Sequence, residues 1–178
     1  MCGIVGYIGY REAYPIVIKG LKRLEYRGYD SAGISVLNGV IKTVKRKGKV
    51  SKLESAAKEK DVTGFVGIGH TRWATHGKPD DINAHPHLSG NGRLALIHNG
   101  IIENYSTLKK ALSDIGHEFL SETDTEVLVH LIEEYQKREN LSLSQAVRRA
   151  LEKAVGAYAI VVIDKENPEI IVGARKSS

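Results

Sequence analysis

Cys2 is the residue whose place in the chain most directly suggests chemistry. Methionine before a small residue is normally removed in the cell, and loss of Met1 would leave Cys2 with both a thiol and a free α-amino group. An α-amine titrates at about 7.7–8.0 and a free thiol at about 8.5, so the amine can take the thiol proton near neutral pH. Such a cysteine is a nucleophile that carries its own base. Considered alone, a cysteine at position 2 is more often an incidental small hydrophobe.

An acyl transfer also needs donors for the developing oxyanion. The sequence His98-Asn99-Gly100 follows a predicted strand at 93–98, where the backbone is free to point donors at a ligand. An asparagine amide and a glycine N–H form a suitable donor pair, each worth a few kcal/mol of barrier. The alternative is an ordinary turn, because Asn and Gly both favour turns, and these residues alone favour that interpretation.

Arg72 and Asp124 could hold the two ends of an amino-acid substrate. Arg72 follows a predicted strand at 65–71, and an arginine can bind a carboxylate through two parallel hydrogen bonds. Asp124 could bind an ammonium group. The alternative for Arg72 is a surface charge. The alternative for Asp124 is a helix cap, a role that it could combine with substrate binding. Trp73, taken alone, is expected to be a packing residue.

Five of the seven histidines lie between residues 70 and 98, which raises the question of a metal site. They are His70, His76, His85, His87 and His98. No cysteine or acidic residue completes a recognised ligand spacing with them. We therefore expect no metal and no other cofactor, and we expect these side chains to form hydrogen bonds in loops around a polar site.

Hydrophobic periodicity predicts alternating short strands and helices that would position these groups. Strands are predicted at 3–9, 32–37, 40–46, 65–71, 93–98, 157–163 and 169–174. Helices are predicted at 12–25, 51–59, 104–115, 124–137 (with Thr123 or Asp124 as its cap) and 144–155. The two classes do not alternate strictly, which favours stacked sheets and helices over a doubly wound sheet.

Composition indicates one globular domain of 178 residues, with 42% hydrophobic and 26% charged residues. No apolar window approaches a membrane span. A single cysteine excludes an internal disulfide, and the first residues do not resemble a secretory signal, so a cytoplasmic protein is expected.

The net charge of the chain is +5, and its densest run of basic residues lies between Lys42 and Lys52, after a hairpin signal at Asn38-Gly39. Because no aromatic residues are interleaved with these cations, a solvated hairpin end is favoured over a nucleic-acid surface.

Four separated motifs together resemble those of the class II glutamine amidotransferases, which are N-terminal nucleophile hydrolases. The motifs are CGIVG at 2–6, RWATHG at 72–77, HNG at 98–100 and TD at 123–124. Finer agreement, in LEYRGYDSAG at 24–33 and HNGIIENY at 98–105, resembles the isomerising glucosamine-6-phosphate synthases. The resemblance runs from residue 2 to the end of the chain, and four motifs in register are far more specific than any one of them.

The resemblance implies an α+β fold, a four-layer αββα sandwich, and a role for each matching residue. Cys2 would attack the side-chain amide of L-glutamine, with Asn99 and the Gly100 N–H as the oxyanion hole. Arg72 would bind the substrate carboxylate and Asp124 its amine. A closing loop would contain Thr75, His76 and Gly77, with Trp73 beside it. Supporting positions would be Arg27 and His98.

The resemblance also implies a larger protein. The family's C-terminal sugar-phosphate isomerase domains, which use ammonia and fructose 6-phosphate, would lie beyond residue 178, and the full-length protein would be a homo-oligomer. We therefore expect residues 1–178 to be a single glutaminase domain of a longer synthase, without nucleic-acid or membrane partners. Two alternatives stay open: the glutaminase domain of another class II amidotransferase, making phosphoribosylamine or asparagine, and a binding module that keeps the fold without the chemistry.

Overall fold

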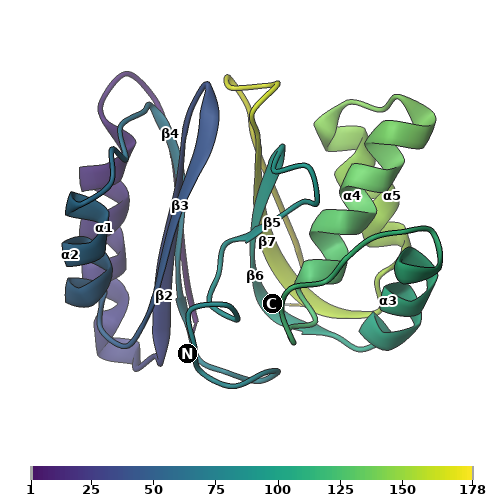
Figure 1. Ribbon diagram of the computed structural model, residues 1–178, viewed down its shortest axis with the longest axis horizontal. Coiled ribbons are helices and arrows are strands. Elements are labelled where there is room, and N and C mark those ends of the chain that lie inside the picture. Colours follow the sequence, from purple (N-terminus) through teal and green to yellow (C-terminus); the bar gives the residue numbers. More distant parts are fainter. Residues whose placement is uncertain (1, 178) are drawn as a thin grey trace.

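The computed structural model describes residues 2–177 and has four layers, with helices outside two facing antiparallel sheets (Figure 1). In sheet order, the first sheet contains β1 (Gly3–Ile8), β4 (Val66–Arg72), β2 (Ser31–Asn38) and β3 (Val40–Lys47). The second contains β5 (His87–Leu88), β6 (Leu94–Ile102), β7 (Gly156–Asp164) and β8 (Ile171–Lys176). This arrangement confirms the expected αββα sandwich.

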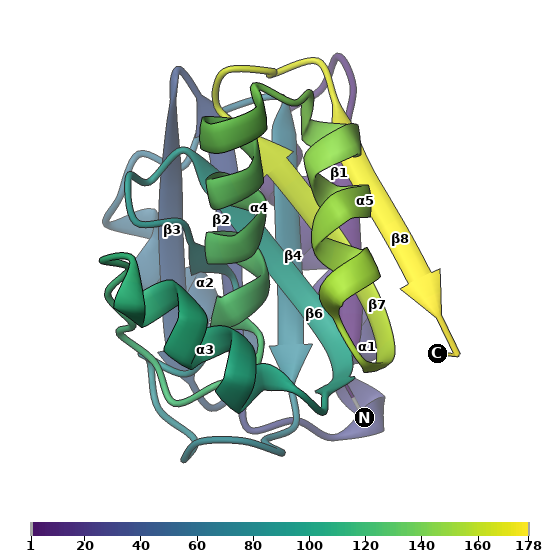
Figure 2. The same ribbon diagram turned by 90° about the vertical axis from the view of Figure 1, so that its right-hand side faces the viewer.

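Helices cover the outer face of each sheet. The first sheet is covered by α1 (Ala13–Leu24), which continues into the short 3₁₀ helix η1 (Glu25–Arg27), and by α2 (Val50–Lys58). The second is covered by α3 (Tyr105–Asp114), α4 (Glu126–Glu139) and α5 (Leu143–Lys153), and Figure 2 shows α4 and α5 lying across β6 and β7. Within residues 2–177, no helix combines the length and the apolar character that crossing a bilayer requires.

Alternation along the strands separates three hydrophobic clusters. On β6, Leu94 and Leu96 belong to the cluster beneath α3–α5, whereas Ala95 and Ile97 belong to the cluster between the two sheets. Successive side chains on a strand point to opposite faces, so β6 contributes to two layers at once. On β4, Ile68 faces the second sheet, and the same period of two places His70 and Arg72 on that inner face.

Gly69 explains how closely α1 packs on β4. A Cβ atom at this position would lie 2.5 Å from Cγ1 of Val17 and 3.0 Å from Cδ1 of Leu21. Both side chains are fully buried. The glycine therefore lets the helix axis approach the sheet, which holds β4 and the catalytic candidates at its end in place.

The structure contains every strand and helix predicted from the sequence, and the end of one strand was predicted wrongly. Each predicted boundary lies within two residues of the observed one, except that the strand expected at 93–98 continues to Ile102. Asn99 and Gly100 therefore do not follow a strand; they lie inside β6, opposite Ala159 and Tyr158 of β7. The short strand β5 and the helix η1 were not predicted from the sequence.

The basic segment after the hairpin makes contacts within the chain. Lys42 pairs with Asp61 at 2.6 Å, and Arg46 lies 3.3 Å from a carboxylate oxygen of Asp81. The ammonium of Lys45 donates to the carbonyl of Ile82 at 2.8 Å, and burial lowers the pKa of this lysine to about 8. The expected solvated hairpin end thus describes only part of the segment, because Lys45 points inward.

Candidate active site

A cavity of about 250 Å³ brings together most of the residues singled out by sequence. It is lined by Cys2, which precedes β1, and by His98 and Gly100 of β6. It is also lined by Arg72 at the end of β4, by Trp73, Thr75 and His76 of the segment that follows, and by Asp124 before α4. The volume is below the range of about 300–1,000 Å³ typical for drug-sized ligands, so the cavity suits a ligand of amino-acid size.

Strand pairing places Cys2 beside Trp73. Gly3 pairs with Thr71 across β1 and β4, so the residue before Gly3 meets the end of β4. The Sγ atom of Cys2 accepts a hydrogen bond from the Trp73 N–H at 3.1 Å. A backbone donor aimed at sulfur stabilises the thiolate, which is the nucleophilic form. The Trp73 side chain itself is half exposed, and its ring lies where a Cβ atom at Gly28 would come within 3.1 Å of it.

The Asn99 side chain links the two sheets next to Cys2. Its Oδ1 atom lies 2.7 Å from Nε2 of His70 on β4, and its Nδ2 donates to the Cys2 carbonyl at 3.3 Å. An amide oxygen can only accept, so the His70 ring donates from Nε2 and fixes which way the amide points. The amide NH₂ is therefore directed toward the backbone of Cys2, although Asn99 is not among the described residues that line the cavity.

Gly100 occupies a conformation that other residues avoid. Its φ is +125°, and a Cβ atom there would lie 2.0 Å from the Ala157 carbonyl oxygen. Only glycine fits this approach of β6 to β7. Gly100 lines the cavity at this point of β6.

Asp124 is a buried carboxylate rather than a helix cap. Helix α4 begins at Glu126 with Thr125 as its N-cap residue, and no side chain caps it. The expected cap at Thr123 or Asp124 is therefore wrong, because Oδ2 of Asp124 accepts from the Ile102 N–H at 2.7 Å. This bond anchors the segment before α4 to the end of β6. The carboxylate is 3% exposed and lines the cavity, so it offers a buried anion to a ligand.

Arg72 is almost fully buried and holds the loop that follows β4. Its guanidinium donates to the carbonyls of His76, Gly77 at 3.2 Å and Lys78 at 3.4 Å. A guanidinium has more N–H donors than these three contacts use, so it can also receive a ligand carboxylate. Gly77 does not line the cavity; its backbone takes part in holding the loop.

Arg27 does not line the cavity. It lies in η1, where Nε lies 3.2 Å from the Tyr26 hydroxyl and the guanidinium lies over the Tyr26 ring at 5.7 Å. The supporting role expected for Arg27 stays a prediction. His76 does line the cavity, and its ring packs 5.2 Å from that of Tyr105 at the start of α3.

Four of the histidines noted in the sequence form one buried cluster. The ring of His85 lies 4.3 Å from that of His70 and 4.8 Å from that of His87. The Thr125 hydroxyl lies 2.9 Å from Nε2 of His85 and 2.8 Å from Nδ1 of His98, so it links these two rings. Burial lowers the pKa of His70 to about 4 and lowers those of His85, His87 and His98. These rings are therefore neutral hydrogen-bonding groups at neutral pH, as the sequence suggested.

This cluster predicts a loss of stability in acid. The unfolded chain binds protons at histidine near pH 6.5, whereas folded His70 stays neutral down to about 4. Below pH 6.5 each such histidine lowers the free energy of unfolding by about 1.4 kcal/mol per pH unit, until its folded pKa is reached. Urea unfolding of the wild type and His70→Gln between pH 7.5 and 4.5 measures this. In the variant, the free energy of unfolding should change less steeply with pH, by an amount that corresponds to about one proton fewer taken up on unfolding. Equal slopes in the two proteins would contradict the prediction.

Several residues of the site were missed by sequence reasoning. A carboxylate oxygen of Asp30 accepts from the Ala74 N–H, and its own N–H donates to the Arg72 carbonyl at 2.8 Å, which fixes the segment beside Cys2. Asn83, 1% exposed, bonds to Lys78 and Glu122 and so ties the loop to the segment before α4. Asp30 lies within a recognisable motif, but nothing in the spacing of Asn83 indicates its contacts.

The glutamine amidotransferase domain model matches residues 70–176, more than half of the chain. The chain belongs to this family. It is 61% identical over 180 residues to glutamine–fructose-6-phosphate aminotransferase (isomerising) of Bacteroides thetaiotaomicron and 57% identical over 185 residues to that of Chlorobaculum tepidum. Both alignments include all of this chain but only 29% and 30% of the relative. The chain thus spans less than a third of the length of these curated relatives.

Two solved structures share the fold of this chain. Glutamine phosphoribosylpyrophosphate amidotransferase from B. subtilis superposes with a TM-score of 0.81 and 31% identity, over 99% of this chain and 37% of that one. An allosteric regulatory enzyme of purine biosynthesis superposes with a TM-score of 0.79 and 33% identity, over 93% of this chain and 36% of that one. The likeness confirms the expected fold of the N-terminal nucleophile hydrolase type.

Proposed function

We propose that this chain hydrolyses the side-chain amide of L-glutamine and supplies the ammonia to a sugar-phosphate isomerase part of the same protein. The observation that carries the proposal is the convergence on one small cavity of a thiol at position 2, a buried arginine and a buried aspartate. A nucleophile between a fixed cation and a fixed anion matches an amide substrate that has both a carboxylate and an ammonium group.

The chemistry begins with proton transfer from the Cys2 thiol to the α-amine that removal of Met1 frees. The thiolate, stabilised by the Trp73 N–H, adds to the amide carbon. The Asn99 amide and the Gly100 N–H receive the oxyanion. The C–N bond then breaks, the ammonium of Cys2 gives its proton to the leaving ammonia, and a thioester remains. Water adds to the thioester and releases glutamate and the free thiol.

The ends of the substrate are held by charges that are already in place. Arg72 receives the α-carboxylate while it keeps the loop carbonyls, and Asp124 receives the α-ammonium while Ile102 holds one of its oxygens. Because both groups are buried, their attraction to a ligand charge is stronger than at a surface. Thr75 and His76 complete the wall of the cavity, and the loop through Gly77 keeps water out until ammonia has left.

The relatives favour one acceptor for the ammonia. Identities of 61% and 57% to aminotransferases that act on glutamine and fructose 6-phosphate exceed the 31% shared with the phosphoribosylpyrophosphate enzyme. We therefore infer that the ammonia aminates fructose 6-phosphate to give glucosamine 6-phosphate, in a C-terminal part that makes the whole protein a homo-oligomer. A free thiol nucleophile also suits a reducing compartment, which is the cytoplasm.

Glutamate release tests the proposed reaction. The chain, shown by intact mass to begin at Cys2, should convert L-glutamine to equal amounts of glutamate and ammonia and leave L-asparagine unchanged. A preparation that retains Met1 should be inactive, because its α-amine is then part of a peptide bond. Activity in the preparation that retains Met1 would contradict the proposed base. Inactivity of both preparations would contradict the assignment of a self-sufficient glutaminase and favour a binding module.

Replacing Arg72 with alanine should mainly weaken glutamine binding. Charge-assisted hydrogen bonds are worth about 1.5–3 kcal/mol, so we expect KM to rise by roughly ten- to a hundredfold with a smaller change in kcat. Steady-state kinetics measure both, and Arg148→Ala, at a highly exposed arginine of α5, is the matched control. An unchanged KM with abolished turnover would contradict the carboxylate-binding role.

A further inference from the structure

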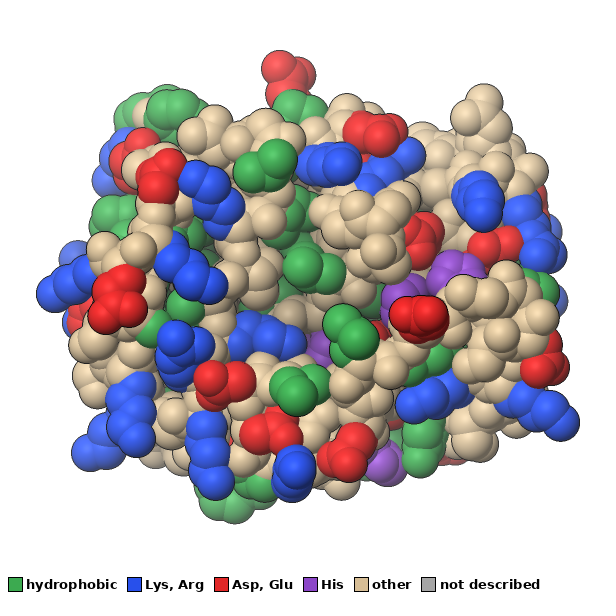
Figure 3. Space-filling view, viewed as in Figure 1, with side chains coloured by type: hydrophobic (Ala, Val, Ile, Leu, Met, Phe, Trp, Pro, Cys, Tyr) green, Lys and Arg blue, Asp and Glu red, His purple; other side chains and the backbone are tan. Residues whose placement is uncertain are grey.

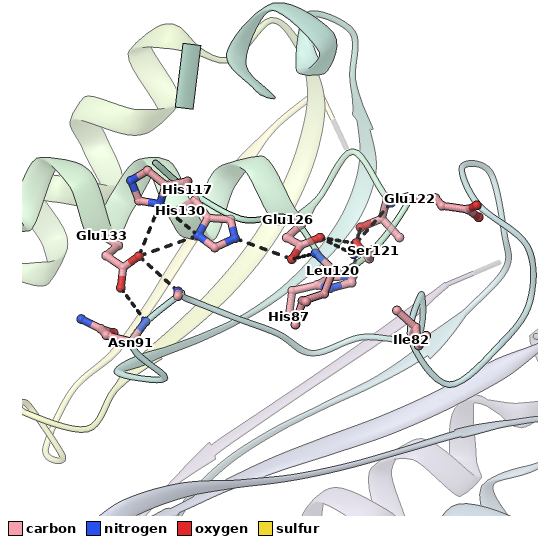
Figure 4. A network of polar contacts seen from close by, with 12 residues as sticks. Ile82, His87, Asn91, His117, Leu120, Ser121, Glu122, Glu126, His130 and Glu133 are labelled. Carbon is pink, nitrogen blue, oxygen red and sulfur yellow. Dashed lines mark hydrogen bonds and ion pairs between the residues drawn. The ribbon is translucent and has the colours of Figure 1, made fainter. Parts of the chain in front are cut away.

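A second cluster of ionisable side chains lies outside the active site, on the helical side of the second sheet (Figure 4). His117 follows α3, and His130 and Glu133 lie one turn apart on α4. Their side chains are 12%, 2% and 11% exposed, so the cluster is largely buried. Figure 3 shows histidine side chains reaching the surface beside acidic ones on this half of the molecule. The proposed glutamine chemistry gives these residues no role.

The three side chains have the spacing of metal ligands. Nδ1 of His117 lies 3.3 Å from Nδ1 of His130, and each of these nitrogens lies 3.7 Å from the same Oε2 of Glu133. A triangle with these sides has a circumradius of about 2.1 Å, which matches zinc bonds of about 2.0–2.2 Å to His nitrogen and carboxylate oxygen. An ion at the centre would therefore reach all three atoms without rearrangement.

The outer contacts of the histidines fit metal ligands as well. Nε2 of His117 lies 2.9 Å from Glu134 Oε2, and Nε2 of His130 lies 3.6 Å from Glu126 Oε1. Histidines that bind a metal through one ring nitrogen usually donate from the other to a carboxylate. With an ion on both Nδ1 atoms, each ring would hold its proton on Nε2, facing a carboxylate. Nε2 of His130 is buried and has no hydrogen-bond partner among the described residues, and a proton held there by this tautomer would face the Glu126 carboxylate.

The carboxylates around the cluster are themselves fixed. The Gly90 and Asn91 N–H groups donate to Glu133 at 3.2 and 3.1 Å. Glu126 accepts from the Leu120 and Ser121 N–H groups at 2.9 and 2.7 Å. The ligand set is thus held in place before an ion arrives, which lowers the cost of ordering it on binding.

An opening beside the cluster leaves room for a further ligand. His117, Glu133 and Glu134 line a cavity of about 560 Å³ that also contacts Arg93 and Gly90. Two imidazoles and one carboxylate suit zinc better than magnesium or calcium, which prefer oxygen ligands alone. Three protein ligands with an open fourth position form a tetrahedral zinc site completed by water.

We propose that His117, His130 and Glu133 form a zinc-binding site that ties the segment after α3 to α4. The ion would also fix the β5–β6 loop, because Gly90 and Asn91 bind the carboxylate of Glu133. The site is independent of glutamine hydrolysis. A bound ion stabilises the folded chain, since the three ligands are brought together only when it folds.

Zinc binding by the metal-stripped chain tests this proposal. Titration calorimetry should give one zinc per chain, and Co²⁺ in its place should show the strong visible absorption of a tetrahedral site. His117→Ala and Glu133→Gln should each weaken zinc binding at least a hundredfold, and Glu134→Gln, which removes only an outer contact, by about ten- to a hundredfold. Glu139→Gln, at the end of the same helix, is the matched control and should bind like the wild type.

The active-site thiol is the competing ligand, so the titration is repeated in Cys2→Ala. Zinc bound equally by Cys2→Ala and released by Glu133→Gln supports the site. If Cys2→Ala loses zinc binding while His117→Ala and Glu133→Gln retain it, the proposal is overturned. Circular dichroism of each variant separates lost ligands from lost fold, and Glu133→Gln keeps the side chain's shape if His117→Ala does not fold. Several zinc ions per chain, unaffected by any variant, would also overturn it.

Discussion

Replacing Cys2 with alanine is expected to abolish glutamate release, with turnover falling by at least about 10⁴-fold. The cavity would lose its thiol, which is the atom that accepts from the Trp73 N–H, while the rest of its described wall would stay intact. The measurement is glutamate produced per chain at saturating L-glutamine, followed for long enough to detect very slow turnover.

Binding separates loss of chemistry from loss of fold in this variant. Cys2→Ala should still bind L-glutamine, because Arg72 and Asp124 keep their contacts with the loop and with Ile102. Calorimetry should therefore give an affinity close to the wild-type KM. Retained turnover in Cys2→Ala would refute the assignment of the nucleophile. Loss of both binding and turnover would indicate instead that residue 2 is needed to build the cavity.

The layers of the fold could be predicted from sequence because apolar spacing alone determines them. Val17 and Leu21 lie on one face of α1, and the hairpin at Asn38-Gly39 joins two strands as its turn chemistry requires. Pairing between distant strands leaves no such local signal. Strand β6 runs on through Asn99 because β7 pairs with it, and a glycine at φ +125° continues a strand where local chemistry favours a turn.

Residue types in the site were predictable, but their contacts were not. Nothing local indicates that the side chain of Asp124 bonds to Ile102 instead of capping α4, or that Arg72 binds the carbonyls of its own following loop. The Asp124 contact depends on where β6 ends relative to the segment before α4, and the Arg72 contacts depend on how its loop folds back. The same reason explains why His117 and His130 drew no attention: they are far apart in sequence from the other histidines, and Glu133 joins them only when α4 packs beside α3.

Replacing Asn99 with alanine is expected to lower kcat by roughly 10²–10³ and to leave KM nearly unchanged. The amide lies next to Cys2, and His70 holds its oxygen so that the NH₂ group donates to the Cys2 backbone carbonyl, beside the thiol. The donor is thus oriented before the substrate binds, and its strongest contact is with the oxyanion of the transition state. Removing such a contact affects kcat and kcat/KM equally.

The control is Asn167→Ala, which removes an amide from the turn between β7 and β8, where it bonds to Asp164. Its kinetics should equal those of the wild type. Wild-type turnover in Asn99→Ala would exclude the amide from the oxyanion hole. A raised KM with unchanged kcat would mean that Asn99 binds the ground state and the transition state equally. A fall in kcat alone, with the folded structure retained, would leave transition-state stabilisation as the role of Asn99, because the thiol, Arg72 and Asp124 are all untouched by the substitution.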